Sequence, residues 1–188
     1  FNPLFFGLDN LHKNEPTLLV GNHTIYGSLD VPLIFSEVLR KKGIAIRGLA
    51  DEAHFKIPVW RDFLHKGGVI VGNRANCSRL MEAGETLLVF PGGAREVAKR
   101  KGEKYQLTWK TRTGFAYMAI KYQYPITPIA SLGADDVYDI LFDAYDFKES
   151  RIGRWLLKNK NINKQLRNGD VIMPITTGIG PTIIPRPE

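Results

Sequence analysis

The sequence lacks the features that mark several classes of protein. Cys77 is its one cysteine, so a disulfide framework is excluded. No apolar run reaches the roughly 18–20 residues that a membrane-spanning helix needs. No cluster of His, Cys and Asp has metal-ligand spacing, and neither the phosphate-loop nor the dinucleotide-binding glycine pattern occurs. We therefore expect a protein with no resident metal and no bound cofactor.

The chain does have enough apolar material to build a core. Of its 188 residues 44% are hydrophobic, including ten Phe, seven Tyr and three Trp, which excludes disorder by composition. This length fits one domain, which we assign to residues 1–188. The chain begins at Phe1 rather than at Met, so we expect it to be trimmed at one or both ends.

The net charge of +7 is unevenly distributed along the chain. Residues 95–123 and 151–167 are mainly basic, whereas residues 135–149 are mainly acidic. Basic patches attract the phosphates of nucleic acids, anionic lipids or nucleotides. Solvated helix faces explain each patch equally well when it is taken alone. Charge by itself therefore leaves the type of partner open.

Apolar runs alternate with helical patterns along most of the chain. We expect strands at residues 17–20, 44–49, 69–71, 86–90, 126–130 and 171–175, and helices at residues 30–42, 58–66, 76–83, 114–122, 137–142 and 152–159. Such alternation predicts an α/β domain with a mixed, largely parallel sheet flanked by helices. Pro128 places the fifth strand near an end or an edge of the sheet.

A single histidine follows the first expected strand. Asn22 and His23 occupy the turn after this strand, and Asp30 stands at the start of the first helical pattern. A base delivered from a strand end, with a carboxylate close by in sequence, suits proton abstraction. Loops beyond strand ends are also usual places for sites in α/β domains. The alternative is that His23 is a turn residue and Asp30 a helix cap.

A second informative stretch follows the fourth expected strand. Pro91, Gly92 and Gly93 end that strand, and Arg95 and Glu96 come directly after. Two glycines let the backbone approach another group closely and expose its N–H donors. Arg95 adds a fixed cation for a phosphate or a carboxyl group. A tight turn with a surface ion pair is the structural alternative.

Two further blocks complete a pattern. Arg74 follows the strand at residues 69–71, and an apolar strand with proline spans residues 124–129. In their order and spacing the four blocks, from about Phe6 to Pro174, resemble the glycerolipid (lysophospholipid) acyltransferase family. The Pro-Gly-Gly form of the third block, followed by Glu, resembles the diacylglycerol and monoacylglycerol acyltransferase branch and its transmembrane-protein-68-like relatives. One departure is that Ser28, not an Asp, lies five residues after His23.

The resemblance implies a PlsC-like acyltransferase fold and a reaction. An acyl group would move from acyl-CoA or acyl carrier protein to a lipid hydroxyl, without an acyl-enzyme. His23 is then the general base and Asp30 the carboxylate that orients it, unless Ser28 or a backbone carbonyl takes that role. The other matched positions are expected to bind substrate: Asn22, Ser28, Arg74, Pro91, Gly92, Gly93, Arg95 and Glu96. The Lys-rich segment 99–104 is expected to hold CoA phosphates or to meet the membrane surface.

The third block also bears on the acceptor. Gly92 replaces the Glu that the family uses with glycerol-phosphate acceptors, which favours a neutral acceptor such as mono- or diacylglycerol or a fatty alcohol. Lysophosphatidate or another lysophospholipid is the alternative acceptor. We expect a cytoplasmic protein that binds the membrane peripherally through residues 1–6 and the basic amphipathic helix near residues 152–157. His54 either lines the acyl or CoA path or is structural.

Three other functions are alternatives to the acyltransferase. A serine hydrolase would use Ser28 with His23, but the G-x-S-x-G pattern is missing. A non-catalytic module would bind acyl lipids without converting them. A nucleic-acid binder is suggested by charge alone and is not expected.

Overall fold

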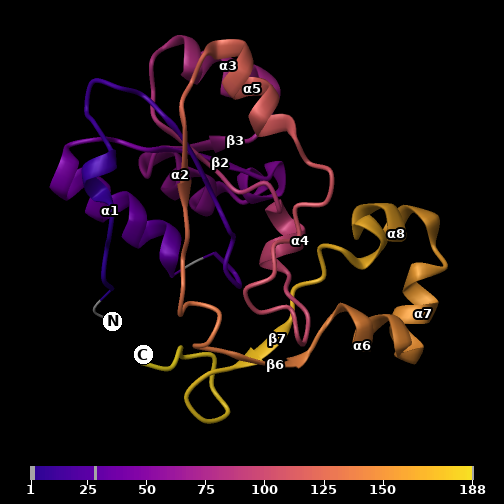
Figure 1. Cartoon of the computed structure of the whole chain (residues 1–188). Coiled ribbons are helices and arrows are strands. Elements are labelled where there is room, and N and C mark those ends of the chain that lie inside the picture. The colour runs from indigo at the N-terminus through magenta and orange to yellow at the C-terminus, as the bar shows by residue number, and fades with distance from the viewer. Residues whose placement is uncertain (1–2, 28, 188) are drawn as a thin grey trace.

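The computed structural model describes residues 3–27 and 29–187, and its central element is a five-stranded sheet (Figure 1). The strands lie in the order β3-β2-β4-β1-β5, and every neighbouring pair is parallel. They are β1 (Leu18–Gly21), β2 (Arg47–Ala50), β3 (Val69–Val71), β4 (Leu87–Val89) and β5 (Ile126–Ile129). The predicted α/β class with a largely parallel sheet is confirmed, and the strand that contains Pro128 lies at an edge.

Helices occupy most of the positions that the apolar periodicity predicts. They are α1 (Asp30–Lys42), α2 (Pro58–Lys66), α3 (Arg74–Glu82), α4 (Gly93–Val97), α5 (Gly114–Tyr122), α6 (Ala144–Glu149), α7 (Arg151–Leu157) and α8 (Lys160–Gln165), with the 3-10 helices η1 (Leu8–Asn10), η2 (Glu52–Lys56) and η3 (Arg167–Gly169). Pro58 begins α2, and Gly43 ends α1 with a positive φ of 65°. In the part of the chain that the structure describes, no helix has the length and apolarity to cross a membrane.

The core lies on both faces of the sheet because alternate residues of β1 point in opposite directions. Leu18 and Val20 pack against α3 and α5 on one face. Leu19 packs against α1 on the other face. Leu18 and Leu19 are at most 1% exposed, and full burial of such a side chain contributes about 1.5–3 kcal/mol. Burial on both faces explains why this strand reads as a continuous apolar run.

The predictions for the C-terminal third were partly wrong. Residues 137–142 were expected to form a helix, but β6 (Asp139–Phe142) pairs antiparallel with β7 (Ile175–Thr177) in a separate two-stranded sheet. Of the strand predicted at residues 171–175, only the last residue, Ile175, lies in β7. This pairing joins segments far apart in sequence, so local periodicity could not reveal it. Figure 1 shows α6, α7 and α8 beyond this small sheet, away from the main sheet.

Candidate active site

The candidate site lies at the carboxyl edge of the parallel sheet. His23 follows β1, Phe90 follows β4, and Ser131 follows β5. Because neighbouring parallel strands end at the same edge, the loops that follow them meet there. The sequence therefore delivers the histidine and the Pro-Gly-Gly loop to one place from segments about 70 residues apart.

His23 is held between Phe90 and the turn at Gly27. The imidazole stacks on Phe90, with ring centroids 4.1 Å apart and planes inclined by 22°. On another side the chain folds back at Gly27, which has a positive φ of 60°. A Cβ atom at Gly27 would lie 2.0 Å from Cε1 of His23. Only glycine therefore lets the loop close against the imidazole.

The loop that carries His23 is tied to neighbouring elements by polar contacts. The Asn22 side chain accepts a hydrogen bond from the Ser131 amide at 2.8 Å and donates one to the Ser131 carbonyl at 2.9 Å. The Ile25 amide donates to Oδ1 of Asp135 at 2.8 Å. The Tyr26 hydroxyl donates to a main-chain carbonyl just before β7 at 2.8 Å. The side chain of Asn22 thus ties this loop to the segment that follows β5, and its predicted contact with substrate stays a prediction.

The environment of His23 keeps its imidazole uncharged. Burial, with smaller effects from the positive charges of Lys99 and His54, lowers the pKa of His23 from 6.5 to about 3. Its Nδ1 atom is buried and has no hydrogen-bond partner among the described residues. A histidine in this state is uncharged at physiological pH, which is the protonation state that a general base needs before it takes a proton.

Asp30 makes no hydrogen bond to the imidazole in the described part of the chain, although the sequence pattern suggests one. It begins α1, and its Oδ1 accepts a hydrogen bond from the Val31 amide at 2.9 Å. Burial raises its pKa, while the hydroxyls of Thr24 and Ser131 act in the opposite direction. Its orienting role stays a prediction, and the alternative group, Ser28, lies outside the described residues.

The Pro-Gly-Gly loop presents one free amide at the carboxyl end of β4. The N–H of Gly93 donates to the carbonyl of Phe90 at 2.9 Å. The N–H of Gly92 has no acceptor among the described residues, although Gly92 is buried. Arg112 steadies the loop from outside, donating to the carbonyls of Pro91, at 3.2 Å, and Gly92. Arg112 was not singled out by sequence reasoning, because nothing local connects it with this loop.

Glu96 occupies the space that Gly92 leaves open. A Cβ atom at Gly92 would lie 2.1 Å from Oε2 of Glu96. Glu96 is 0% exposed, and neither carboxyl oxygen has a hydrogen-bond partner among the described residues. Burial raises its pKa, and the amide of His23 and the positive charge of Lys99 partly offset this effect. This glutamate therefore lies inside the fold beside the main chain of the predicted base.

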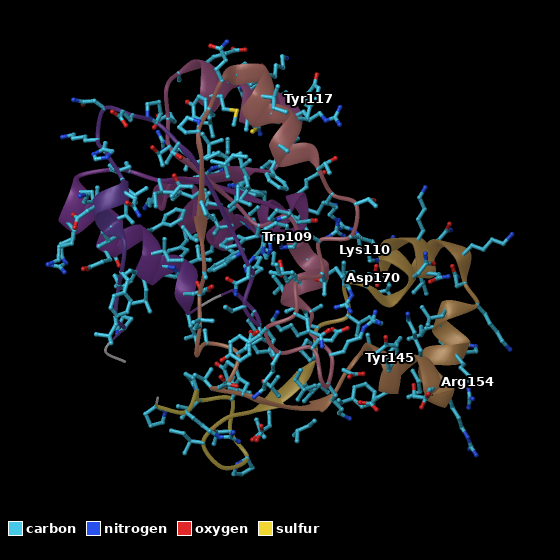
Figure 2. All side chains as sticks on the ribbon, in the orientation of Figure 1. Trp109, Lys110, Tyr117, Tyr145, Arg154 and Asp170 are labelled. Carbon is cyan, nitrogen blue, oxygen red and sulfur yellow. The ribbon has the colours of Figure 1, made fainter. Side chains whose placement is uncertain are left out.

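The basic and acidic segments of the sequence neutralise one another. Arg95 pairs with Glu103 at 2.5 Å and lies 3.6 Å from Asp170, which also pairs with Arg100 and Lys110 at 3.1 Å each. Figure 2 shows Lys110 and Asp170 side by side, where the segment before α5 meets the C-terminal helices. Three further pairs join the Lys-rich segment to the acidic one: Lys99–Asp135, Lys101–Asp146 and Lys104–Asp136. Contacts of these cations with CoA phosphates stay predictions.

Two other predicted residues lie on neighbouring elements. Arg74 is exposed at the start of α3, with its guanidinium 5.6 Å from the ring centre of Tyr117 on α5, a side chain labelled in Figure 2. His54 lies in η2 and accepts a hydrogen bond from the indole of Trp60 at 3.2 Å. Because the charge of His54 acts on the pKa of His23, His54 belongs to the surroundings of the site.

Comparison with known proteins adds to this geometry. Residues 4–132 match the family model described as Acyltransferase. The chain is 31% identical over 172 residues to phytyl ester synthase 2, chloroplastic, of Arabidopsis thaliana, covering 87% of this chain and 24% of that relative. It is 29% identical over 150 residues to the DGAT1/2-independent enzyme synthesizing storage lipids of Bos taurus, covering 75% of this chain and 44% of that relative. The chain thus spans less than half the length of these relatives, and no solved structure matches it.

Proposed function

This chain belongs to the acyltransferase family, and from that premise we propose that it transfers a fatty acyl group from a thioester to the hydroxyl of a neutral lipid. The donor is an acyl-CoA or an acyl carrier protein, and the reaction needs no resident cofactor. One observation carries the proposal. His23 is a buried histidine held uncharged at the carboxyl edge of the sheet, beside a glycine loop whose Gly92 amide has no acceptor among the described residues.

The mechanism uses a neutral base and a backbone donor. An alcohol is a poor nucleophile, so His23 takes its proton while the oxygen attacks the thioester carbonyl carbon. The carbonyl electron pair moves onto oxygen, and the free N–H of Gly92 is the candidate donor to this oxyanion. When the intermediate collapses, the C–S bond breaks and the imidazolium returns its proton to the thiolate. The products are an ester and a thiol, and no acyl-enzyme forms.

Charge pairing around the site favours a neutral acceptor. Arg95 and Lys99 each face carboxylates, so both cations are already compensated within the fold. The two relatives are named for phytyl esters and for storage lipids, both of which are neutral. A phosphate-bearing acceptor is the second candidate. Arg112 favours it, because this arginine adjoins the Pro-Gly-Gly loop and has no carboxylate partner among the described residues.

We also propose that the protein binds a membrane surface peripherally through α7. Ile152 and Trp155 are 69% and 72% exposed on this helix, where Arg151 and Arg154 are also exposed. In Figure 2 the Arg154 side chain extends away from the rest of the molecule. An interfacial helix buries such apolar side chains among lipid headgroups while its basic side chains meet anionic lipid. The cytoplasmic location expected from the sequence belongs to this proposal.

An acceptor panel tests the proposed reaction. The protein is incubated with palmitoyl-CoA, or with the acyl carrier protein thioester, and with phytol, a fatty alcohol, mono- or diacylglycerol, or lysophosphatidate. Ester formation and thiol release are measured together. We expect faster ester formation with the neutral acceptors than with lysophosphatidate. Turnover with lysophosphatidate alone would overturn the neutral acceptor, and the lack of any ester would overturn the enzymatic proposal.

A further inference from the structure

A buried ion pair lies beneath the loop of His23. Lys99 and Asp135 are each 2% exposed, and Nζ of Lys99 lies 3.3 Å from Oδ2 of Asp135. Both residues belong to charged stretches of the sequence that read as solvated surface. Burying a charged pair costs free energy that its mutual attraction often does not recover. A pair in this position is therefore a candidate for a functional role.

Asp135 joins the loop of the base to the Lys-rich segment. Its Oδ1 accepts the Ile25 amide at 2.8 Å, two residues after His23. Its Oδ2 accepts the Tyr105 amide at 3.2 Å and faces Lys99. One carboxylate thus fixes the main chain next to the base, the segment after α4 and the buried ammonium group.

The charge of Lys99, which balances this carboxylate, also acts on the imidazole. Its positive charge is the second cause, after burial, that disfavours protonation of His23. It also acts on Glu96, whose carboxyl group lies beside the His23 amide. The charged groups that act on the ring come from the segment after α4, through Lys99, and from η2, through His54. Lys99 and Asp135 thus act on both the position and the charge of the base.

We propose that Lys99 and Asp135 are positioning residues for His23, with Asp135 fixing the loop of the base through the Ile25 amide and Lys99 holding Asp135 in place as its buried counter-ion. This inference rests on the proposed function and deepens it, because it says what holds the base in place when Asp30 does not bind it. Neither residue touches the reacting atoms in this account.

The test compares this buried pair with exposed pairs of the same segments. Lys99→Met and Asp135→Asn are made beside the controls Asp136→Asn and Asp146→Asn, whose ion pairs with lysines are at least partly exposed. We expect both buried-site variants to lower kcat by at least about tenfold, a loss typical of a misplaced catalytic group, with little change in KM for the donor. The controls should stay near the wild-type kcat.

A double variant separates positioning from simple stability. Lys99→Met with Asp135→Leu replaces both buried charges with apolar side chains and also removes the acceptor of the Ile25 amide. We expect its Tm to recover toward the wild-type value while kcat stays low. Recovery of kcat together with Tm would show that the pair only supports the fold, and would overturn the inference.

An NMR titration gives a readout that does not depend on turnover. The imidazole signals of His23, assigned by their loss in His23→Gln, are followed with pH in the wild type and in Lys99→Met. We expect Lys99→Met to raise the pKa of His23 measurably toward its ordinary value. An unchanged titration would overturn the role of Lys99 even if the wild type showed no acyl transfer, whereas inactivity of the wild type alone counts only against the proposed function.

Discussion

The imidazole of His23 lies flat against the phenyl ring of Phe90, with ring centroids 4.1 Å apart. Packing, rather than a hydrogen bond to a carboxylate, therefore fixes the plane of this ring in the described part of the chain, where its Nδ1 atom has no partner. This arrangement places a neutral base at the carboxyl edge of a parallel sheet. We expect this base to respond to mutation and to pH differently from a conventional histidine–carboxylate pair.

Asp30→Asn should have a small effect on turnover. Replacing the carboxylate that orients a catalytic histidine typically lowers kcat about 10⁴-fold. Because no hydrogen bond joins Asp30 to the imidazole, we expect kcat of this variant within about tenfold of the wild type. Steady-state kinetics with a neutral acceptor checks this, and a loss near 10⁴-fold would restore Asp30 as the orienting group.

Gly27→Ala should damage the site directly. The new Cβ atom would lie 2.0 Å from Cε1 of His23, so the ring must move. A misplacement of about 1 Å can lower a rate on the order of 10²-fold, and we expect a loss of that size in kcat. Gly84→Ala is the matched control, because Gly84 also has a positive φ, 70°, but open space around its Cβ position. Equal losses of kcat in both variants would show that backbone strain alone causes the effect.

The pH profile should show an unusually acidic base. The pKa of His23 lies at about 3 instead of 6.5, because burial and the charge of Lys99 disfavour protonation. The neutral form therefore persists as pH falls through 6.5, and kcat/KM should not decline there. We expect kcat/KM to fall only at lower pH, where acid also destabilises the folded protein. A fall in kcat/KM between pH 7 and pH 6 that is seen in the wild type but not in His23→Gln would contradict this prediction.

The same pKa makes a prediction for stability with a definite sign. Between pH 6.5 and about 3 the unfolded chain protonates His23 while the native protein does not. The unfolded state then binds more protons, so the contribution of His23 lowers the free energy of unfolding as pH falls through this window. In His23→Gln this contribution is removed, and we expect a shallower loss of stability on acidification in denaturant titrations. A steeper loss in the variant would contradict the assignment.

Membrane binding should depend on the apolar side chains of α7. Ile152→Ser with Trp155→Ser removes the most exposed apolar groups of this helix. We expect much weaker co-sedimentation with vesicles of phosphatidylcholine and phosphatidylserine, because less apolar area enters the headgroup region. Ile120→Ser on α5, at an isoleucine that is 80% exposed, is the control and should bind as the wild type does. Unchanged binding of the α7 variant would place the membrane contact elsewhere.

Local patterns predicted much of the fold. The apolar runs of the first five strands and the periodicity of α1, α2, α3 and α5 are local properties, and they gave the parallel sheet and the edge on which His23 stands. The family identification from four short blocks is likewise confirmed. By contrast, local patterns predict a helix at β6, because its partner β7 lies more than 30 residues away.

The site was less accessible to sequence reasoning than the fold. Phe90 is an apolar residue at a strand end, and nothing local marks it as the surface on which the base stacks. Lys99 and Asp135 lie 36 residues apart by their numbering, each in a stretch of like charge, so their buried pairing could not be read from spacing. The seven-residue separation of His23 and Asp30 suggested a pair, but the turn at Gly27 directs the chain so that Asp30 meets Thr24 and Ser131.

The most direct test of the account is the turnover of His23→Gln. Ester formation from palmitoyl-CoA and a neutral lipid alcohol is measured for this variant and the wild type, with Tm recorded to show that both are folded. We predict that the variant loses about 10²–10⁴-fold in kcat, the usual contribution of a general base, at a nearly unchanged Tm. A folded variant that retains kcat within a few-fold of the wild type would contradict the central claim.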